Sequence, residues 1–208
     1  MIRGDLSNCV VHLTRGATRE LAAESFVSIL KSRQLRGSDL DIRGGYECVC
    51  FSEAPLSALV HSLALPAEHG MRYAPFGVMV RKKWLFDMGG RPVIYQTEAE
   101  FELLHERQRF RHVRYDPARS CDYTWEREWR VQTGLLELDL REVTFVVPTR
   151  SWEERFLEQH AAGIGILSWF DSEMLEFGAP RSPWHFVVLE DFGLELGYAT
   201  EAKPTPAP

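Results

Sequence analysis

The sequence lacks most of the features that would assign it to an obvious class. Only four of its 208 residues are cysteines, and no Cys-x-x-Cys pair occurs, which argues against a zinc ribbon. The motifs HExxH, GxSxG, GxGxxG and GxxxxGK[ST] are all absent. No apolar window approaches the length of a membrane span, and the N-terminus has no signal-peptide stretch. We therefore expect a cytoplasmic protein without a membrane partner, whose cysteines form neither disulfides nor zinc sites.

Positive charge is also in short supply. The chain has 24 Lys and Arg against 30 Asp and Glu, a formal net charge of −6. This balance argues against a broad basic surface for nucleic acid, since such binding depends on many phosphate contacts. A local basic groove remains compatible with it.

Apolar residues are abundant by comparison. They make up 45% of the chain and aromatic residues 12%, enough for a large core without disulfides or metal. The length predicts one domain over residues 1–198. The composition of residues 199–208 predicts a disordered tail.

Periodicity and turn signals predict a mixture of helices and strands. Strands are expected at 9–13, 46–51, 76–80, 92–95, 143–147, 163–170 and 184–190, with a long strand or hairpin at 125–138. Helices are expected from Thr18 to before Gly37 and at 55–66, 82–86 (or a turn), 98–111 and 152–162. Because helix and strand do not alternate regularly, we expect an α+β fold with two packed mixed sheets and flanking helices.

Polar residues at two predicted strand ends are the first candidates for a site. His12 lies in an apolar strand, where it could donate to a ribose hydroxyl or act as a core histidine bonded to backbone. Ser52 and Glu53 directly follow the strand at 46–51. They could project toward a ligand, or cap the helix that begins near Pro55.

The segment from Glu126 to Arg130 carries the strongest chemical signal. On a strand, Glu126, Glu128 and Arg130 would share one face. Paired carboxylates raise each other's pKa, and a carboxylate can stabilise an oxocarbenium-like centre. Arg130 would moderate the repulsion and hold one carboxylate in place. The alternative is a solvated strand face with a cross-strand ladder of charges.

Two basic clusters could contact phosphates, although a solvated helix face is the simpler interpretation. They consist of Arg107, Arg109, Arg111, His112 and Arg114, and of Arg72, Arg81, Lys82 and Lys83.

Taken in order, several segments resemble the AbiGi-type abortive phage infection family. They are VHLTRG, ILKSRQLRGS, CVCFSEAPLSAL, FGVMVRKKWLFDMGGRPVIY and WEREWRV, and together they span roughly residues 9–131. The same layout is similar to the wider ADP-ribosyltransferase superfamily, including DarT-type DNA-modifying toxins. The resemblance implies split mixed β-sheets with flanking helices.

That resemblance also implies roles for individual residues. His12 matches the first-strand position of ADP-ribosyltransferases, Ser52 the second-strand position, and Glu128 the catalytic glutamate, with Glu126 two residues before it. The motif around Ser52 is Phe-Ser-Glu, which departs from the Ser-Thr-Ser of the arginine-modifying group.

The implied activity is transfer of ADP-ribose from NAD to a macromolecule, with a nucleobase in DNA or RNA as acceptor, in a toxin or phage-defence role. The resemblance implies that His12, Thr14, Arg15 and Ser52 bind NAD, with Arg15 on the pyrophosphate. Glu128 would stabilise the oxocarbenium as nicotinamide leaves, while Glu126 would deprotonate the acceptor.

Two other functions remain open from the sequence. The first is a non-enzymatic antitoxin or sensor that keeps the fold and binds a cognate toxin or antitoxin protein. The second is a nuclease that holds a divalent metal with Asp122, Glu126 and Glu128.

Overall fold

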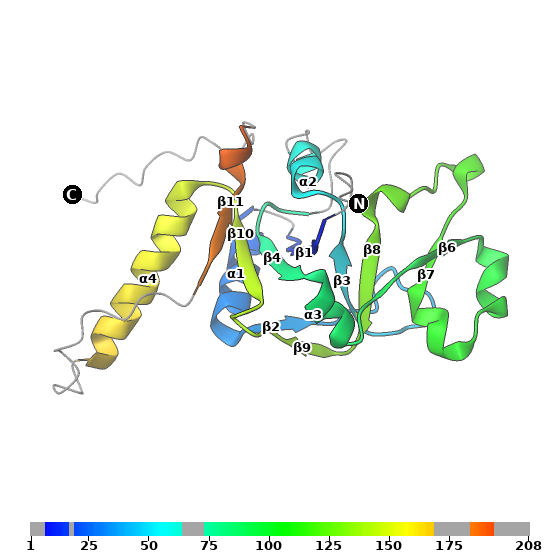
Figure 1. Ribbon diagram of the computed structural model, residues 1–208, viewed down its shortest axis with the longest axis horizontal. Coiled ribbons are helices and arrows are strands. Elements are labelled where there is room, and N and C mark those ends of the chain that lie inside the picture. Colours follow the sequence, from blue (N-terminus) through cyan, green and yellow to red (C-terminus); the bar gives the residue numbers. More distant parts are fainter. Residues whose placement is uncertain (1–6, 17–18, 64–72, 169–183, 194–208) are drawn as a thin grey trace.

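The computed structural model describes residues 7–16, 19–63, 73–168 and 184–193, which form a mixed α+β fold (Figure 1). The expected α+β class is therefore confirmed. The tail predicted over 199–208 lies outside the described residues, as does Thr18, the expected helix cap.

The strands form one large and two small sheets. They are β1 (Cys9–Leu13), β2 (Gln34–Arg36), β3 (Cys48–Ser52), β4 (Gly77–Arg81), β5 (Arg91–Pro92), β6 (Ile94–Gln96), β7 (His112–Arg114), β8 (Glu128–Gln132), β9 (Leu135–Glu137), β10 (Val143–Val147) and β11 (Phe186–Val188). The seven-stranded sheet has the order β11-β10-β4-β1-β3-β8-β5, in which β10 and β11 run parallel and the other neighbours antiparallel. The small sheets are the antiparallel pair β2–β9 and the parallel pair β6–β7.

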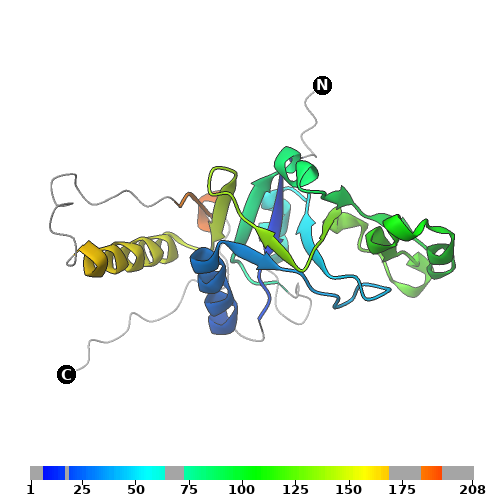
Figure 2. The same ribbon diagram turned by 90° about the horizontal axis from the view of Figure 1, so that it is seen from below.

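Helices lie on both faces of the large sheet and at its ends. The α-helices are α1 (Arg19–Ser32), α2 (Leu56–Leu63), α3 (Lys82–Asp87) and α4 (Arg150–Ser168). The 3-10 helices are η1 (Glu98–Leu103), η2 (Glu106–Arg111), η3 (Pro117–Arg119), η4 (Thr124–Glu126) and η6 (Leu189–Phe192). Figures 1 and 2 place α4 at one end of the molecule, and β6, β7, η1 and η2 in a lobe at the other. No helix in the described part of the chain is long and apolar enough to cross a bilayer.

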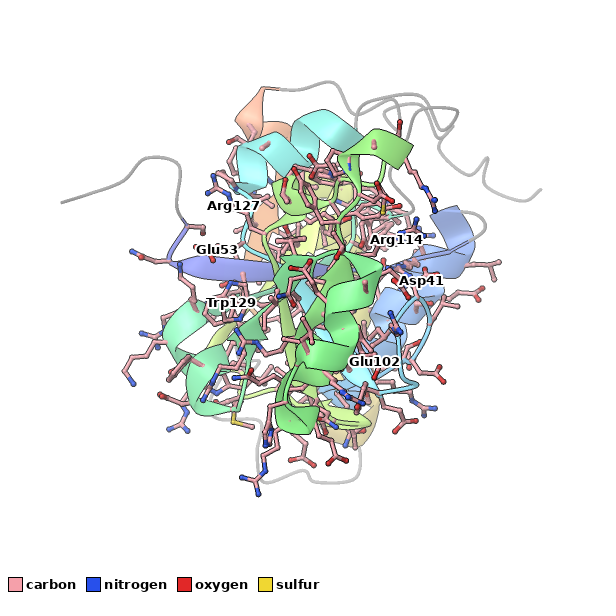
Figure 3. All side chains as sticks on the ribbon, turned by 90° about the vertical axis from the view of Figure 1, so that its right-hand side faces the viewer. Asp41, Glu53, Glu102, Arg114, Arg127 and Trp129 are labelled. Carbon is pink, nitrogen blue, oxygen red and sulfur yellow. The ribbon has the colours of Figure 1, made fainter. Side chains whose placement is uncertain are left out.

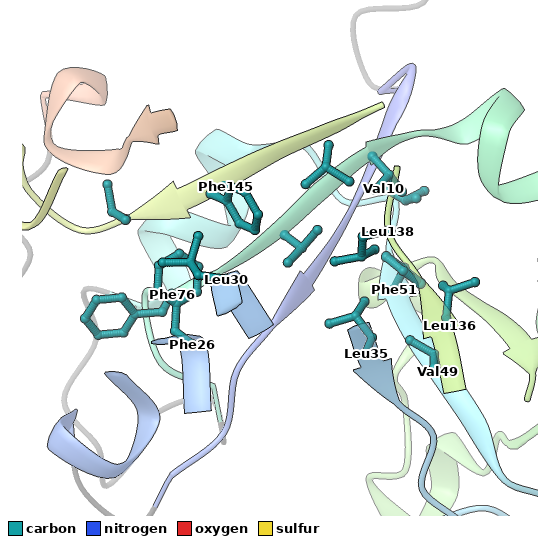
Figure 4. Close-up of a cluster of buried hydrophobic side chains, with 14 of the residues drawn as sticks. Val10, Phe26, Leu30, Leu35, Val49, Phe51, Phe76, Leu136, Leu138 and Phe145 are labelled. Atoms are coloured by element: carbon teal, nitrogen blue, oxygen red, sulfur yellow. The ribbon is translucent and has the colours of Figure 1, made fainter. Parts of the chain in front are cut away.

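The main core lies between the large sheet, α1, α4 and the β2–β9 pair (Figure 4). Phe26 of α1 is fully buried, and its ring centroid lies 5.6 Å from that of Phe76 and 5.9 Å from that of Phe145. Leu35 of β2 and Leu136 of β9 belong to the same cluster, so the small sheet packs on the large one. A smaller cluster, formed by residues from β1, β10, α2 and η6, covers the other face.

The large sheet is split between β1 and β3. β1 pairs with β4 at five positions and β3 with β8 at five, but β1 and β3 pair only at Val11 and Ser52. His12 follows this single pair, and its Nδ1 lies 2.8 Å from the Cys50 carbonyl oxygen. A hydrogen bond of the His12 side chain therefore takes the place of backbone pairing where β1 and β3 diverge.

The prediction of a continuous helix over 98–111 is wrong. Its residues form the two 3-10 helices η1 and η2, with Leu104 extended between them at ψ 135°. Thr97 and Glu100 form a capping box that starts η1, and His105 accepts a hydrogen bond from the Arg107 backbone at the start of η2. Each half therefore has its own cap, and Phe101 and Phe110 are buried as expected.

The strand expected over 163–170 is also wrong, because α4 continues to Ser168; residues 169 and 170 lie outside the described part. A short apolar run does not distinguish a strand from a helix, and extending a formed helix costs less than starting a new element. The segment 125–138 is neither one strand nor a hairpin: it comprises the end of η4, then β8 and β9, and these two strands pair with different partners. The strand β2 was not expected.

Candidate functional site

A cleft of about 500 Å³ opens at the split in the sheet. Its walls come from β1, α1, β2, β3, α2, η4 and β8, together with Tyr73. The polar and ionisable side chains among the lining residues are those of His12, Thr14, Arg15, Ser25, Ser28, Ser32, Gln34, Arg36, Ser38, Cys48, Cys50, Ser52, Tyr73, Glu126 and Glu128. Positive and negative groups thus face the same space.

The six residues to which the resemblance assigns NAD-binding or catalytic roles all line this cleft: His12, Thr14, Arg15, Ser52, Glu126 and Glu128. His12, Ser52 and Glu128 therefore meet at one cleft, although Ser52 and Glu128 are far apart in sequence. Strand register explains it, since Val11 pairs with Ser52 and Ser52 pairs with Glu128 across three neighbouring strands.

Glu128 begins β8 and is held by a buried arginine. Arg130 Nε donates to Glu128 Oε1 at 2.8 Å and Arg130 Nη2 to Oε2 at 3.1 Å. Arg130 Nη1 in turn donates to the carbonyl oxygens of Phe110 and His112 at 2.9 and 3.0 Å. The side chain of Arg130 is only 5% exposed and that of Glu128 13%, so the fork fixes an ionised carboxylate at the cleft. The expectation that Arg130 would hold a carboxylate is confirmed.

Glu126 reaches the cleft by a different route from the one predicted. It ends η4 rather than sharing a strand face with Glu128, because Arg127 adopts the left-handed conformation at φ 47° and breaks the alternation. Burial first, and then the charge of Glu128, raise the pKa of Glu126 to about 7 against the weaker opposing effects of Arg15 and Arg130. The two carboxyl groups therefore differ: one is locked in an ion pair, and the other is half-protonated near neutral pH.

Ser52 and Glu53 take opposite directions from the end of β3. Ser52 Oγ donates to the Glu126 carbonyl oxygen at 2.6 Å and accepts from the Ala54 backbone N–H at 3.1 Å. Glu53 instead accepts from Lys82 Nζ at 2.6 Å and from Trp129 Nε1 at 2.7 Å, and it does not line the cleft. Figure 3 labels Glu53 and Trp129 on the side away from Asp41. Ser52 is thus the member of the pair that belongs to the site.

The imidazole of His12 is held in one tautomer. The Cys50 carbonyl can only accept, so Nδ1 carries the proton and Nε2 is an acceptor. Burial lowers the pKa of His12, the bond to Cys50 opposes that shift, and the charge of Arg15 adds to it. His12 is therefore neutral at physiological pH, and its ring lies edge-on to Phe51 with centroids 5.7 Å apart.

Thr14 and Arg15 continue the chain beyond β1. Thr14 is buried and its Oγ1 donates to the Phe76 carbonyl oxygen at 3.1 Å. Because its proton is used in this bond, the hydroxyl can only accept a hydrogen bond from a ligand. Arg15 is exposed and its Nη2 donates to the Tyr73 hydroxyl at 3.3 Å. Tyr73 thereby restrains the direction of the Arg15 guanidinium at the cleft.

Sequence reasoning missed Tyr95 of β6. Its hydroxyl accepts from the Glu128 backbone N–H at 3.1 Å and donates to the Tyr123 carbonyl oxygen at 3.1 Å. It therefore ties the start of β8 to the loop that carries η4. Nothing local in the sequence indicates this bond, because Tyr95 and Glu128 are brought together only by the chain path.

The residues of the proposed nuclease site do not gather. The carboxylate of Asp122 accepts from the backbone N–H and hydroxyl of Thr124 at 2.9 and 2.6 Å. Within the described ranges, no group of three or more His, Cys, Asp or Glu side chains could hold a metal ion. All four cysteines are free thiols.

Comparisons of the chain with protein-family models, with curated proteins and with solved structures found no match. The functional argument therefore depends on the residues of the cleft.

Proposed function

We propose that this chain is an NAD-dependent ADP-ribosyltransferase that modifies a nucleobase of DNA or RNA in a toxin or phage-defence role. The meeting of His12, Ser52, Glu126 and Glu128 at one cleft carries the proposal. The cleft lies at a split in a mixed sheet, as the resemblance to ADP-ribosyltransferases implies. Its volume of about 500 Å³ is within the range of cofactor and small-molecule sites.

Glu128 has the properties needed to stabilise a developing cation. In the proposed reaction the bond between ribose C1′ and nicotinamide breaks, its electron pair leaves with nicotinamide, and positive charge develops on the ribose. A carboxylate already ionised and held by Arg130 needs little reorganisation to meet that charge. Each oxygen also keeps a lone pair that can accept from a ribose hydroxyl.

Glu126 is suited to act as the general base. A base works best when its pKa lies near the operating pH, and the pKa of Glu126 is about 7. As the acceptor atom bonds to C1′, Glu126 takes up its proton. Because the base must be ionised, transfer should increase with pH through about 7.

The remaining cleft residues would bind NAD. The acceptor Nε2 of His12 can receive a hydrogen bond from a ribose hydroxyl or from the nicotinamide amide. Arg15 provides a guanidinium for the pyrophosphate, which it can contact through two N–H groups. Ser52 and Thr14 border the same space, where Ser52 also holds the backbone of Glu126.

The experiment compares wild type with Glu128→Gln, Glu126→Gln and the control Glu158→Gln, an exposed carboxylate of α4. Nicotinamide release and labelling of DNA, RNA and lysate protein are measured separately. Glu128→Gln should lose roughly 100-fold to 1,000-fold in both assays while still binding NAD. Glu126→Gln should lose labelling more than nicotinamide release, and Glu158→Gln should lose neither.

Thermal melting of each variant separates loss of chemistry from loss of folding. A wild-type protein that consumes no NAD with any acceptor pool would refute the proposal and favour the non-enzymatic antitoxin or sensor. Full activity in both Glu128→Gln and Glu126→Gln would mean that the carboxylates do not carry the reaction.

A further inference from the structure

The two basic clusters of the sequence differ sharply in how their charge is used. In the cluster of residues 72–83, every described cation meets a carboxylate. Arg81 forks onto Glu142 at 2.6 and 2.7 Å, Lys82 binds Glu53 at 2.6 Å, and Lys83 binds Asp87 at 2.7 Å. Arg72 lies outside the described residues. This cluster has little charge left for a ligand.

The cluster of residues 107–114 lies on η2 and β7, in the lobe that faces the viewer in Figure 3. Three of its members are used internally. His112 is buried, and its Nε2 lies 3.1 Å from the Thr97 carbonyl oxygen, while Arg109 pairs with Glu102 at 3.3 Å. Arg114 pairs with Asp116 at 3.4 Å. Arg111 forms no ion pair with a carboxylate of the described chain.

Arg111 is instead bonded to Pro92, the residue that follows a second arginine, Arg91, in β5. Arg91 Nη1 donates to the carbonyl oxygens of Phe86 and Gly90 at 2.9 and 2.7 Å, and its guanidinium lies 3.9 Å from the centroid of the Phe86 ring. Arg111 Nε donates to the Pro92 carbonyl oxygen at 2.8 Å. Burial first, and then the charge of Arg91, lower the pKa of Arg111.

Arg111 is thus anchored to the backbone next to Arg91, and neither arginine forms an ion pair with a carboxylate of the described residues. The backbone carbonyls anchor each guanidinium through one nitrogen, so other N–H donors of both groups remain for a ligand. Paired, pre-oriented guanidinium groups are suited to bidentate recognition of a phosphate.

We infer that Arg91 and Arg111 bind a phosphodiester of single-stranded nucleic acid and hold the acceptor strand beside the cleft. The acceptor's identity rests on the proposed function. A base that is to be modified must leave its duplex partner, which favours a single strand. Arg91 pairs with Arg130, two residues from Glu128, so strand geometry sets its Cα roughly 8–9 Å from that of Glu128.

The inference also fits the acidic balance of the chain. With a net charge of −6, the protein cannot rely on long-range attraction to a polyanion. Local phosphate contacts by a few arginines would give weak, salt-sensitive binding whose strength depends on those side chains.

The test uses the full chain and fluorescein-labelled single-stranded DNA and RNA, with fluorescence anisotropy measured over a series of salt concentrations. The variants are Arg111→Gln, Arg91→Gln/Arg111→Gln and the control Arg81→Gln, which removes the same charge from a neutralised pair. The double variant should bind at least ~10-fold more weakly, with a salt slope smaller by roughly 0.7, the value for one phosphate on a single strand. Arg81→Gln should match wild type.

Arg91 also contacts carbonyls at the end of α3, so its removal can lower the melting temperature of the double variant. If it does, the comparison uses Arg111→Gln, which breaks a single hydrogen bond to the backbone. Wild-type affinity and slope in Arg111→Gln would overturn the inference, as would equal weakening in Arg81→Gln. Displacement of the oligonucleotide by inorganic phosphate at the same concentration of phosphate groups would indicate a free-phosphate site instead. A wild type that binds the strand but consumes no NAD would refute the proposed function and leave this inference standing.

Discussion

Glu126 makes stability depend on pH in the direction opposite to that of most carboxylates. Its pKa rises from 4.5 to about 7 on folding, chiefly through burial and then through the charge of Glu128. Between these values the folded state binds more protons than the unfolded state. The free energy of unfolding contributed by this group therefore decreases as pH rises through that window.

The size of the effect follows from the shift. A displacement from 4.5 to about 7 corresponds to at most about 3.4 kcal/mol at pH values above 7. Because the side chain is partly exposed, solvent screening reduces this to on the order of 1–2 kcal/mol. Glu126→Gln removes the group that must ionise, so this variant should be more stable than wild type by that amount at pH 8 and equal to it near pH 4.

Urea unfolding of wild type, Glu126→Gln and the control Glu158→Gln across this pH range would measure the difference. The curves of wild type and Glu126→Gln should diverge as pH rises, whereas Glu158→Gln should follow wild type throughout. Parallel curves, or a Glu126→Gln variant that is less stable at pH 8, would show that Glu126 is not buried beside a second carboxylate.

Two further outcomes follow from the same structure. Glu128→Gln should reduce the free energy of unfolding by roughly 3 kcal/mol, because it leaves Arg130 buried without a counter-charge. In urea unfolding, the double variant Glu128→Gln/Arg130→Met should recover part of that loss. If it recovers none, the pairing of Glu128 with Arg130 is contradicted. Burial raises the pKa of Cys48 to about 11 and also raises that of Cys50, so neither thiol should react with a thiol reagent at pH 8 in the native protein. Four thiols should react after unfolding without reductant, and a smaller number would indicate a disulfide.

Several elements follow from local sequence. The bounds of β1 and β10 agree with the strands expected at 9–13 and 143–147, because short apolar runs rich in valine favour buried strands. The helix ahead of Gly37 follows from apolar residues at helical spacing, with Phe26 and Leu30 buried as that pattern requires. The candidates His12, Ser52 and Glu128 could be found because each is a polar residue in a strand or at its end.

Other features depend on contacts between distant parts of the chain. The turn at Arg127 separates Glu126 from the strand that local alternation predicts, and Ser52 holds the Glu126 backbone from another strand. The bond from Tyr95 to Glu128, and the bond from Arg111 to Pro92 next to Arg91, join residues that share no local pattern.

The sequence by itself thus determined the α+β class, most strands and the residue types of the cleft, since these depend on periodicity and side-chain chemistry. Tertiary structure alone decided that the sheet splits between β1 and β3, that Glu126 and Glu128 have different environments, and that Arg91 and Arg111 have no carboxylate partner among the described residues. Each of these is set by burial and by through-space charge, which act between residues remote in sequence.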